Sequence, residues 1–207
     1  MNLLNFLKEL VAIDTSSPKN YQKCANLVAK EAESLGLKAN VISPTREGAW
    51  GNTMRALPRR QNEHSWVSPI GKDGLPRPNV IISYEVGAKK TLILNAHYDT
   101  VPAGDEVSWK TKPFELVVKD GKAFGRGAGD DKGGIAVGMA ILERLKERKF
   151  KKMNAVLLCT CDEEVGSELG LKHVVGEKLV AGDFGIVLDG SADRIEIGSC
   201  GSVLGSI

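Results

Sequence analysis

The sequence contains little histidine and little cysteine: its 207 residues include three histidines and four cysteines. It also lacks an uncharged apolar stretch of about 18 residues, as a membrane-spanning helix requires, so we expect no membrane association. The cysteines fall inside expected helices and strands, unlike the disulfide framework of a small secreted domain. They are Cys24, Cys159, Cys161 and Cys200. We therefore expect reduced thiols and a cytoplasmic location.

An excess of charge of one sign is also absent. Lys plus Arg number 28 and Asp plus Glu number 26, and the sequence has no basic block. A nucleic-acid-binding groove requires clustered positive charge, so no nucleic-acid partner is expected. Hydrophobic residues make up 42% of the sequence, which is enough for a core, and we expect a single domain over residues 1–207.

Strand-like and helix-like segments alternate along the chain, which predicts an α/β fold with a mixed, largely parallel sheet flanked by helices. Helical periodicity covers the N-terminal residues 3–10 and the segments 20–35, 132–146 and 167–175. Apolar and β-branched runs predict strands over residues 38–42, 53–57, 79–84, 91–96, 155–161 and 184–188. The pair Asp120-Gly121 predicts a hairpin within residues 114–124, and the polar segment 58–78 reads as a loop or an insertion.

Four side chains of the kind that bind metal ions follow strand-like runs or the glycine-rich turn before residue 132. They are His97, Asp130, Glu164 and Asp189. In open α/β sheets, ligands bind outside the carboxyl ends of the strands, so we expect these side chains to converge on one crevice. Carboxylates with few histidines suit a hard or borderline divalent ion, and Zn²⁺ with an open position for water is common in hydrolases.

His97 and Asp99 flank Tyr98 in the extended segment that leaves the predicted strand 91–96. Alternate residues of a strand share a face, so the two side chains lie together and Asp99 is spaced to orient the imidazole of His97. Taken alone, the same pattern also fits a structural histidine beside a turn aspartate.

Two acidic clusters each have a structural alternative. Asp130 and Asp131 precede a predicted helix, where one carboxylate caps the helix and the second is free to bind something else. Asp162, Glu163 and Glu164 leave a buried strand together, and such a triplet is either solvated or relieved of its repulsion by a cation. The functional interpretation gives Glu164 to the metal and keeps Glu163 as a general base.

Cys159 and Cys161 share one face of a predicted buried strand, and thiolates also bind zinc. No second cysteine pair lies at ligand spacing, so core packing is favoured over a metal site for these two thiols.

The ordered segments HYDTVPAGD (97–105), GRGAGDDKGG (125–134) and DEEVGS (162–167), with Trp109 and Pro113-Phe114 between them, resemble those of a known family. It is the di-zinc metallopeptidase and amidohydrolase family of acetylornithine deacetylase, succinyl-diaminopimelate desuccinylase, aminoacylase and glutamate carboxypeptidase. The resemblance extends from the first helices to Asp189 and implies a zinc exopeptidase-like catalytic domain.

The resemblance also implies a role for each site residue. His97 and Asp189 would hold one Zn²⁺, Glu164 would help to hold a second, and Asp130 would bridge the two, with Co²⁺ as a substitute metal. Asp99 would orient His97, and Glu163 would be the base that takes a proton from water. The peptide bond Asp130-Asp131 is expected to be cis.

The family normally continues into an inserted lid or dimerisation domain, which also carries the dimer surface, and later returns to supply a last histidine. We therefore expect residues 1–207 to be a catalytic-type domain truncated before the lid, without the usual homodimer surface. The leading hypothesis is metal-dependent hydrolysis of an amide bond in a small N-acyl amino acid or peptide, of the deacylase or carboxypeptidase type. The alternative is a truncated, catalytically inactive metal-binding domain.

Overall fold

The computed structural model describes residues 1–42, 71–190 and 195–197. The predicted strand 53–57, the first part of the predicted loop 58–78 and Cys200 lie outside these residues. In the described part of the chain, none of the helices combines the length and the apolar character needed to cross a bilayer.

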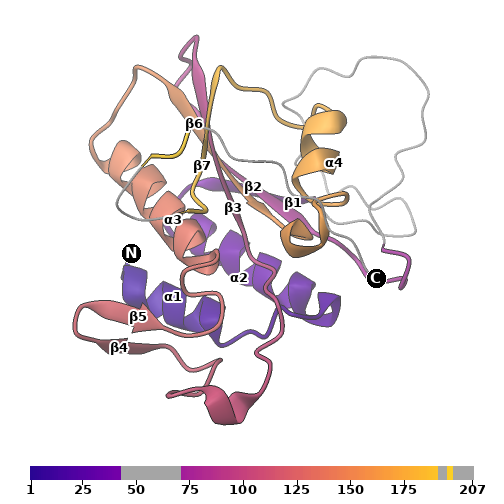
Figure 1. Ribbon diagram of the computed structural model, residues 1–207. Coiled ribbons are helices and arrows are strands. Elements are labelled where there is room, and N and C mark those ends of the chain that lie inside the picture. Colours follow the sequence, from indigo (N-terminus) through magenta and orange to yellow (C-terminus); the bar gives the residue numbers. More distant parts are fainter. Residues whose placement is uncertain (43–70, 191–194, 198–207) are drawn as a thin grey trace.

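A mixed five-stranded sheet forms the centre of the fold, with the strand order β1-β2-β6-β3-β7 (Figure 1). The strands are β1 (Lys38–Ile42), β2 (Asn79–Tyr84), β3 (Thr91–His97), β6 (Asn154–Thr160) and β7 (Phe184–Val187). β3 pairs in parallel with both β6 and β7, whereas β2 is antiparallel to β1 and β6. Four of these five strands therefore point the same way, as predicted for a largely parallel sheet.

Helices cover both faces of this sheet. α1 (Leu3–Val11), α2 (Tyr21–Ser34) and α3 (Lys132–Glu147) pack on one face, and α4 (Leu171–Gly176) lies on the other (Figure 1). The alternation of side chains along β6 explains both layers, because Leu157 and Cys159 belong to the larger core while Val156 and Leu158 face α4. The predicted α/β layering is confirmed.

Local sequence signals account for where the elements begin and end. Asn2 caps α1 by accepting a hydrogen bond from the amide of Asn5 at 3.1 Å, and α2 is followed by Gly36 at a φ of 65°. The hairpin β4 (Val117–Lys119) and β5 (Lys122–Phe124) turns at Asp120-Gly121, both with positive φ, as predicted. It forms a separate two-stranded sheet beside α1 (Figure 1).

The segment after β6 differs in detail from the predicted helix over 167–175. A short 3₁₀ turn, η3 (Glu163–Val165), comes first, and α4 begins at Leu171. Asp162 and Gly166 on either side of η3 adopt positive φ values of 59° and 104°, which interrupts a continuous helix. Two further 3₁₀ turns, η1 (Pro18–Asn20) and η2 (Glu106–Ser108), connect other elements.

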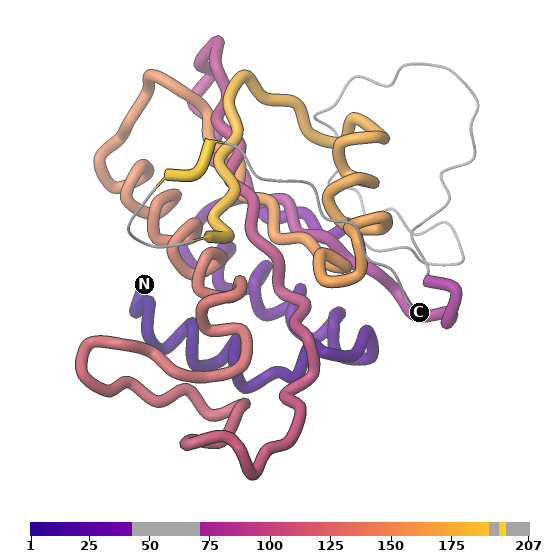
Figure 2. The backbone as a smooth tube through the Cα atoms, in the orientation of Figure 1, coloured from indigo at the N-terminus to yellow at the C-terminus, as the bar shows by residue number. Residues whose placement is uncertain are grey.

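The parallel arrangement of β3, β6 and β7 brings their carboxyl ends to one edge of the sheet. The register pairs His97 with Thr160 and Asn95 with Val187, so the residues that follow all three strands emerge side by side. α3 begins at the same edge, where the chain after β7 comes down beside it (Figure 2). Leu188, just after β7, packs against this helix at Gly138. A Cβ atom at position 138 would lie 3.1 Å from the side chain of Leu188.

Candidate metal centre

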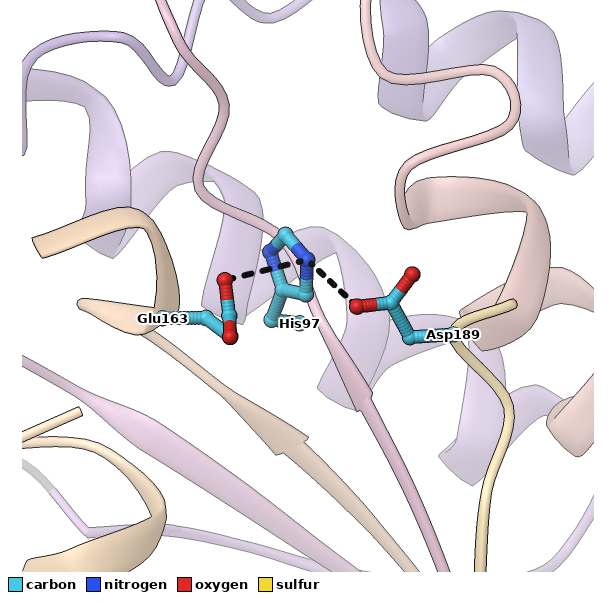
Figure 3. A group of neighbouring side chains, drawn as sticks. All are labelled: His97, Glu163 and Asp189. Atoms are coloured by element: carbon cyan, nitrogen blue, oxygen red, sulfur yellow. Dashed lines mark ion pairs between the residues drawn. The ribbon is translucent and has the colours of Figure 1, made fainter. Parts of the chain in front are cut away.

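Three side chains from the ends of neighbouring strands meet at this edge. His97 ends β3, Glu163 follows β6 and Asp189 follows β7, and one potential ligand atom of each lies within 4.8 Å of the others. Figure 3 shows the two carboxylates on either side of the imidazole. His97 and Asp189 were predicted as metal ligands and Glu163 as the general base of the same site, and the structure places the three side chains together.

The imidazole of His97 is buried, with a side chain that is 2% exposed, and its two nitrogens have different surroundings. Nδ1 lies 3.0 Å from the backbone carbonyl oxygen of Asp99 and 3.4 Å from its carboxylate. When Nδ1 carries the proton it donates to that carbonyl, which leaves the lone pair of Nε2 for a ligand. Asp99 thus contacts the ring as expected, but the hydrogen bond goes to its main chain.

Nε2 of His97 faces carboxylates and makes no hydrogen bond within the described residues. Asp130 Oδ1 lies 2.9 Å from it, Asp189 Oδ2 3.6 Å and Glu163 Oε2 3.9 Å. A buried polar nitrogen without a hydrogen-bond partner is rare in folded proteins. One nitrogen and several carboxylate oxygens at these separations form a donor set that fits a divalent cation.

Of the two adjacent aspartates, Asp131 caps the helix and Asp130 is free to face the cluster. Asp131 caps α3 by accepting a hydrogen bond from the amide of Gly134 at 3.2 Å, and it accepts a second from the amide of His97 at 3.1 Å. The side chain of Asp130 is 66% exposed and points to Nε2 of His97. The bond between the two aspartates is cis, as expected.

Glu163 and Glu164 point in different directions from the turn after β6. The backbone amide of Glu164 donates to Asp99 Oδ2 at 3.1 Å, and its Oε1 accepts a hydrogen bond from the amide of Val101 at 3.1 Å. Glu164 therefore faces the segment after β3, while Glu163 faces the imidazole. The division of their roles between metal binding and proton transfer remains a prediction.

Burial and the density of negative charge shift the pKa values at this edge of the sheet. Burial lowers the pKa of His97, but the Asp99 carboxylate 3.4 Å from Nδ1, helped by Asp131 and Asp130, outweighs it and raises the pKa to about 10. Burial also raises the pKa of Asp131 to about 7 and, with neighbouring carboxylates, the pKa values of Glu163 and Glu164. The balance of burial and neighbouring negative charge thus favours the protonated form of each of these four groups.

The two thiols weighed as an alternative zinc site are buried in the core. Cys159 and Cys161 have exposed fractions of 0%, and burial holds both pKa values well above the usual range of a thiol. Core packing is therefore the role that the structure supports.

Two residues behind the acidic turn were missed by the sequence interpretation. Arg77 donates a hydrogen bond to Asp162 at 2.8 Å, and Asn79 accepts one from the amide of Cys161 at 3.2 Å. These contacts join residues more than 80 positions apart, so no local pattern announces them.

The sequence profile of Peptidase family M20/M25/M40 matches residues 93–200, which is just over half of the 207-residue chain. An uncharacterized metallohydrolase of Methanocaldococcus jannaschii is 37% identical over 143 residues, covering 64% of this chain and 34% of that protein. The succinyl-diaminopimelate desuccinylase of Buchnera aphidicola is 30% identical over 203 residues, covering 96% of this chain and 45% of that protein.

Among solved structures, an M20 family metallo-carboxypeptidase from Sulfolobus solfataricus shares the fold, with a TM-score of 0.67 and 24% identity. The similarity covers 90% of this chain and 37% of the carboxypeptidase chain. The chain thus spans less than half the length of each of these three proteins.

Proposed function

Because the chain belongs to peptidase family M20/M25/M40, we propose that this edge of the sheet is the metal centre of an amide-bond hydrolase. One observation carries the proposal. Nε2 of His97 is buried, lacks a hydrogen bond within the described residues and faces three carboxylates at 2.9 to 3.9 Å. A purely structural histidine would usually satisfy this buried nitrogen with a hydrogen bond, whereas here it meets a group of carboxylate oxygens.

In the proposed site, His97 and Asp189 would hold one Zn²⁺, Glu164 would help to hold a second, and Asp130 would be a ligand shared by the two. The position of Asp130 supports the bridging role, because its side chain is exposed and the neighbouring Asp131 already caps α3. Co²⁺ would take the same donors, since carboxylate and imidazole ligands accept several divalent ions of this size.

The protein residues divide the remaining tasks. A bound divalent cation supplies Lewis-acid polarisation of the scissile carbonyl. Glu163 takes a proton from the attacking water at its carboxylate and passes it to the leaving amine. Burial, and then the charge of Asp189, raises the pKa of Glu163 above its ordinary value, which makes its carboxylate a stronger base. Asp99 holds the ring of His97 from the Nδ1 side.

The proposed substrate class is a small N-acyl amino acid or peptide. It is supported by the desuccinylase from Buchnera and the carboxypeptidase from Sulfolobus, whose names describe cleavage of such amide bonds. We propose that residues 1–207 act as a catalytic-type domain.

Metal content and hydrolysis, measured on the same preparation, test this function. The proposal expects two zinc ions per chain by elemental analysis and hydrolysis of a panel of N-acetyl, N-succinyl and dipeptide substrates. The alternative, a metal-binding domain without catalysis, predicts one tightly held ion and no turnover. A chain that binds no divalent ion would exclude both functions.

A further inference from the structure

Arg77 lies behind the acidic turn and uses every nitrogen of its guanidinium group. Nε donates to Asp162 Oδ1 at 2.8 Å, Nη2 to Asp73 Oδ2 at 2.9 Å and Nη1 to the carbonyl oxygen of Leu75 at 3.0 Å. The group also lies 5.6 Å from the ring centroid of Tyr21. The side chain is 10% exposed, so Arg77 is a fixed cation inside the protein.

Its partner Asp162 sets the direction in which the chain leaves β6. The side chain of Asp162 is 7% exposed, and its backbone has a φ of 59° and a ψ of 19°, a left-handed conformation that residues other than glycine seldom adopt. The carbonyl oxygen of Asp162 accepts a hydrogen bond from the amide of Ser167 at 2.6 Å, which closes the turn. Glu163 and Glu164 are the first two residues of this turn.

Asn79 holds the same turn two residues further along the Arg77 segment. Its Oδ1 accepts a hydrogen bond from the amide of Cys161 at 3.2 Å, and its Nδ2 donates to the carbonyl oxygen of Leu169 at 3.0 Å. The turn is closed tightly, since a Cβ on Gly170 would lie 1.9 Å from the carbonyl oxygen of Cys161. Residues 77–79 therefore contact both ends of the turn.

We propose that Arg77 is a positioning residue for the metal centre, acting through Asp162 to aim Glu163 and Glu164. The inference rests on the proposed function, because the aim of the two glutamates matters only if they bind metal or move a proton. Arg77 contacts Asp73, Leu75, Asp162 and the Tyr21 ring. Its effect on the two glutamates is therefore indirect and passes through Asp162. Loss of the cation leaves the buried Asp162 carboxylate without its charge partner, and the turn then shifts to hydrate it.

The variant Arg77→Met, studied by Co²⁺ titration, tests this proposal. Methionine retains part of the apolar stem and removes the cation. We expect the dissociation constant for Co²⁺ to rise about 10- to 100-fold, the usual effect of losing a residue that orients metal ligands, and the visible Co²⁺ spectrum to change. Arg77→Lys keeps the positive charge but loses the planar guanidinium with its several fixed donors. The Co²⁺ affinity of this variant should therefore lie between those of Arg77→Met and the unaltered chain.

Lys90→Met is the matched control. It removes an ion pair with Asp183 at 2.6 Å, but Lys90 lies next to the first residue of β3, at the opposite end of the strand from His97. Its Co²⁺ affinity and spectrum should equal those of the unaltered chain. Thermal unfolding of each metal-free variant shows whether it is folded at the titration temperature.

A merely structural role predicts a lower unfolding midpoint for Arg77→Met with unchanged Co²⁺ affinity and spectrum, and that result would overturn the inference. If Arg77→Met does not fold, Arg77→Lys decides between weaker binding, which supports the inference, and unaltered binding, which refutes it. If the unaltered chain binds no Co²⁺, the proposed function fails and the inference fails with it. Unaltered binding by the variants thus identifies failure of the inference alone.

Discussion

The backbone amide of His97 donates a hydrogen bond to the side chain of Asp131 at 3.1 Å. The same carboxylate accepts a hydrogen bond from the amide of Gly134 in the first turn of α3. One buried side chain thus joins the last residue of β3 to the beginning of α3. Its neighbour Asp130 is left free to face the imidazole.

The two aspartates should therefore respond differently to removal. Asp131→Ala deletes a helix cap and leaves a buried amide of His97 without an acceptor, so the free energy of unfolding should fall by about 1–3 kcal/mol. Asp130→Ala removes an exposed side chain and should change the metal-free stability by less than about 0.5 kcal/mol. Urea denaturation in the presence of a chelator measures both values. Equal destabilisation by the two substitutions would contradict this division of roles.

The stability of the metal-free chain should fall as the pH rises from 3.8 to about 8. Folding raises the pKa of Asp131 from 3.8 to about 7, mainly through burial. Folding also raises the pKa of His97 from 6.5 to about 10, because the nearby carboxylates outweigh the effect of burial. In each case the folded chain binds more protons than the unfolded chain, so the contribution is complete below the unfolded pKa and is lost as the pH rises through the folded one. Burial lowers the pKa of Lys132 to about 8, which has the opposite effect but only above this window.

Chemical denaturation across this pH range, with and without Zn²⁺, checks the sign. A bound cation replaces the protons, so the slope with Zn²⁺ should be smaller or reversed. A metal-free chain whose stability rises between pH 3.8 and about 8 would show that the carboxylates around His97 are not arranged as described.

Much of the fold could be predicted because its signals are local. The apolar run 91–96 and the Asp120-Gly121 turn each specify one element through neighbouring residues. The strand order could not be predicted in the same way, since β6 lies between β2 and β3 although it follows both in the chain. That placement depends on contacts between residues far apart in sequence.

In the candidate site too, features set by local sequence could be predicted and features set by long-range contacts could not. His97 and Asp189 could be named because each directly follows or ends a strand, and parallel strands carry such residues to one edge of the sheet. Which of Glu163 and Glu164 faces the imidazole depends on the left-handed backbone of Asp162, and its partner Arg77 is 85 residues away. The sequence shows the acidic triplet but not the direction in which each member points.

His97 and His173, the two histidines in the described part of the chain, offer a matched test of metal binding. His97→Gln removes the central nitrogen of the cluster and should abolish stabilisation by Zn²⁺, which for an intact site amounts to about 2.7 kcal/mol at 100 times the dissociation constant. His173→Gln changes a residue of α4 and should leave this stabilisation intact. Thermal unfolding with and without Zn²⁺ gives the comparison, and equal stabilisation of the two variants would place the binding site elsewhere.

The roles of the two glutamates can be separated by replacing each with the amide of the same shape. Glu163→Gln should keep the metal content of the unaltered chain and lower hydrolysis by about 10²–10⁴-fold, because the side chain loses its ability to accept a proton. Glu164→Gln should lose metal, because its carboxylate is a proposed ligand. Elemental analysis and initial rates on the same samples distinguish the two effects. If Glu163→Gln loses metal instead, the geometry at His97, where Glu163 Oε2 lies 3.9 Å from Nε2, identifies Glu163 as the ligand and the predicted roles are reversed.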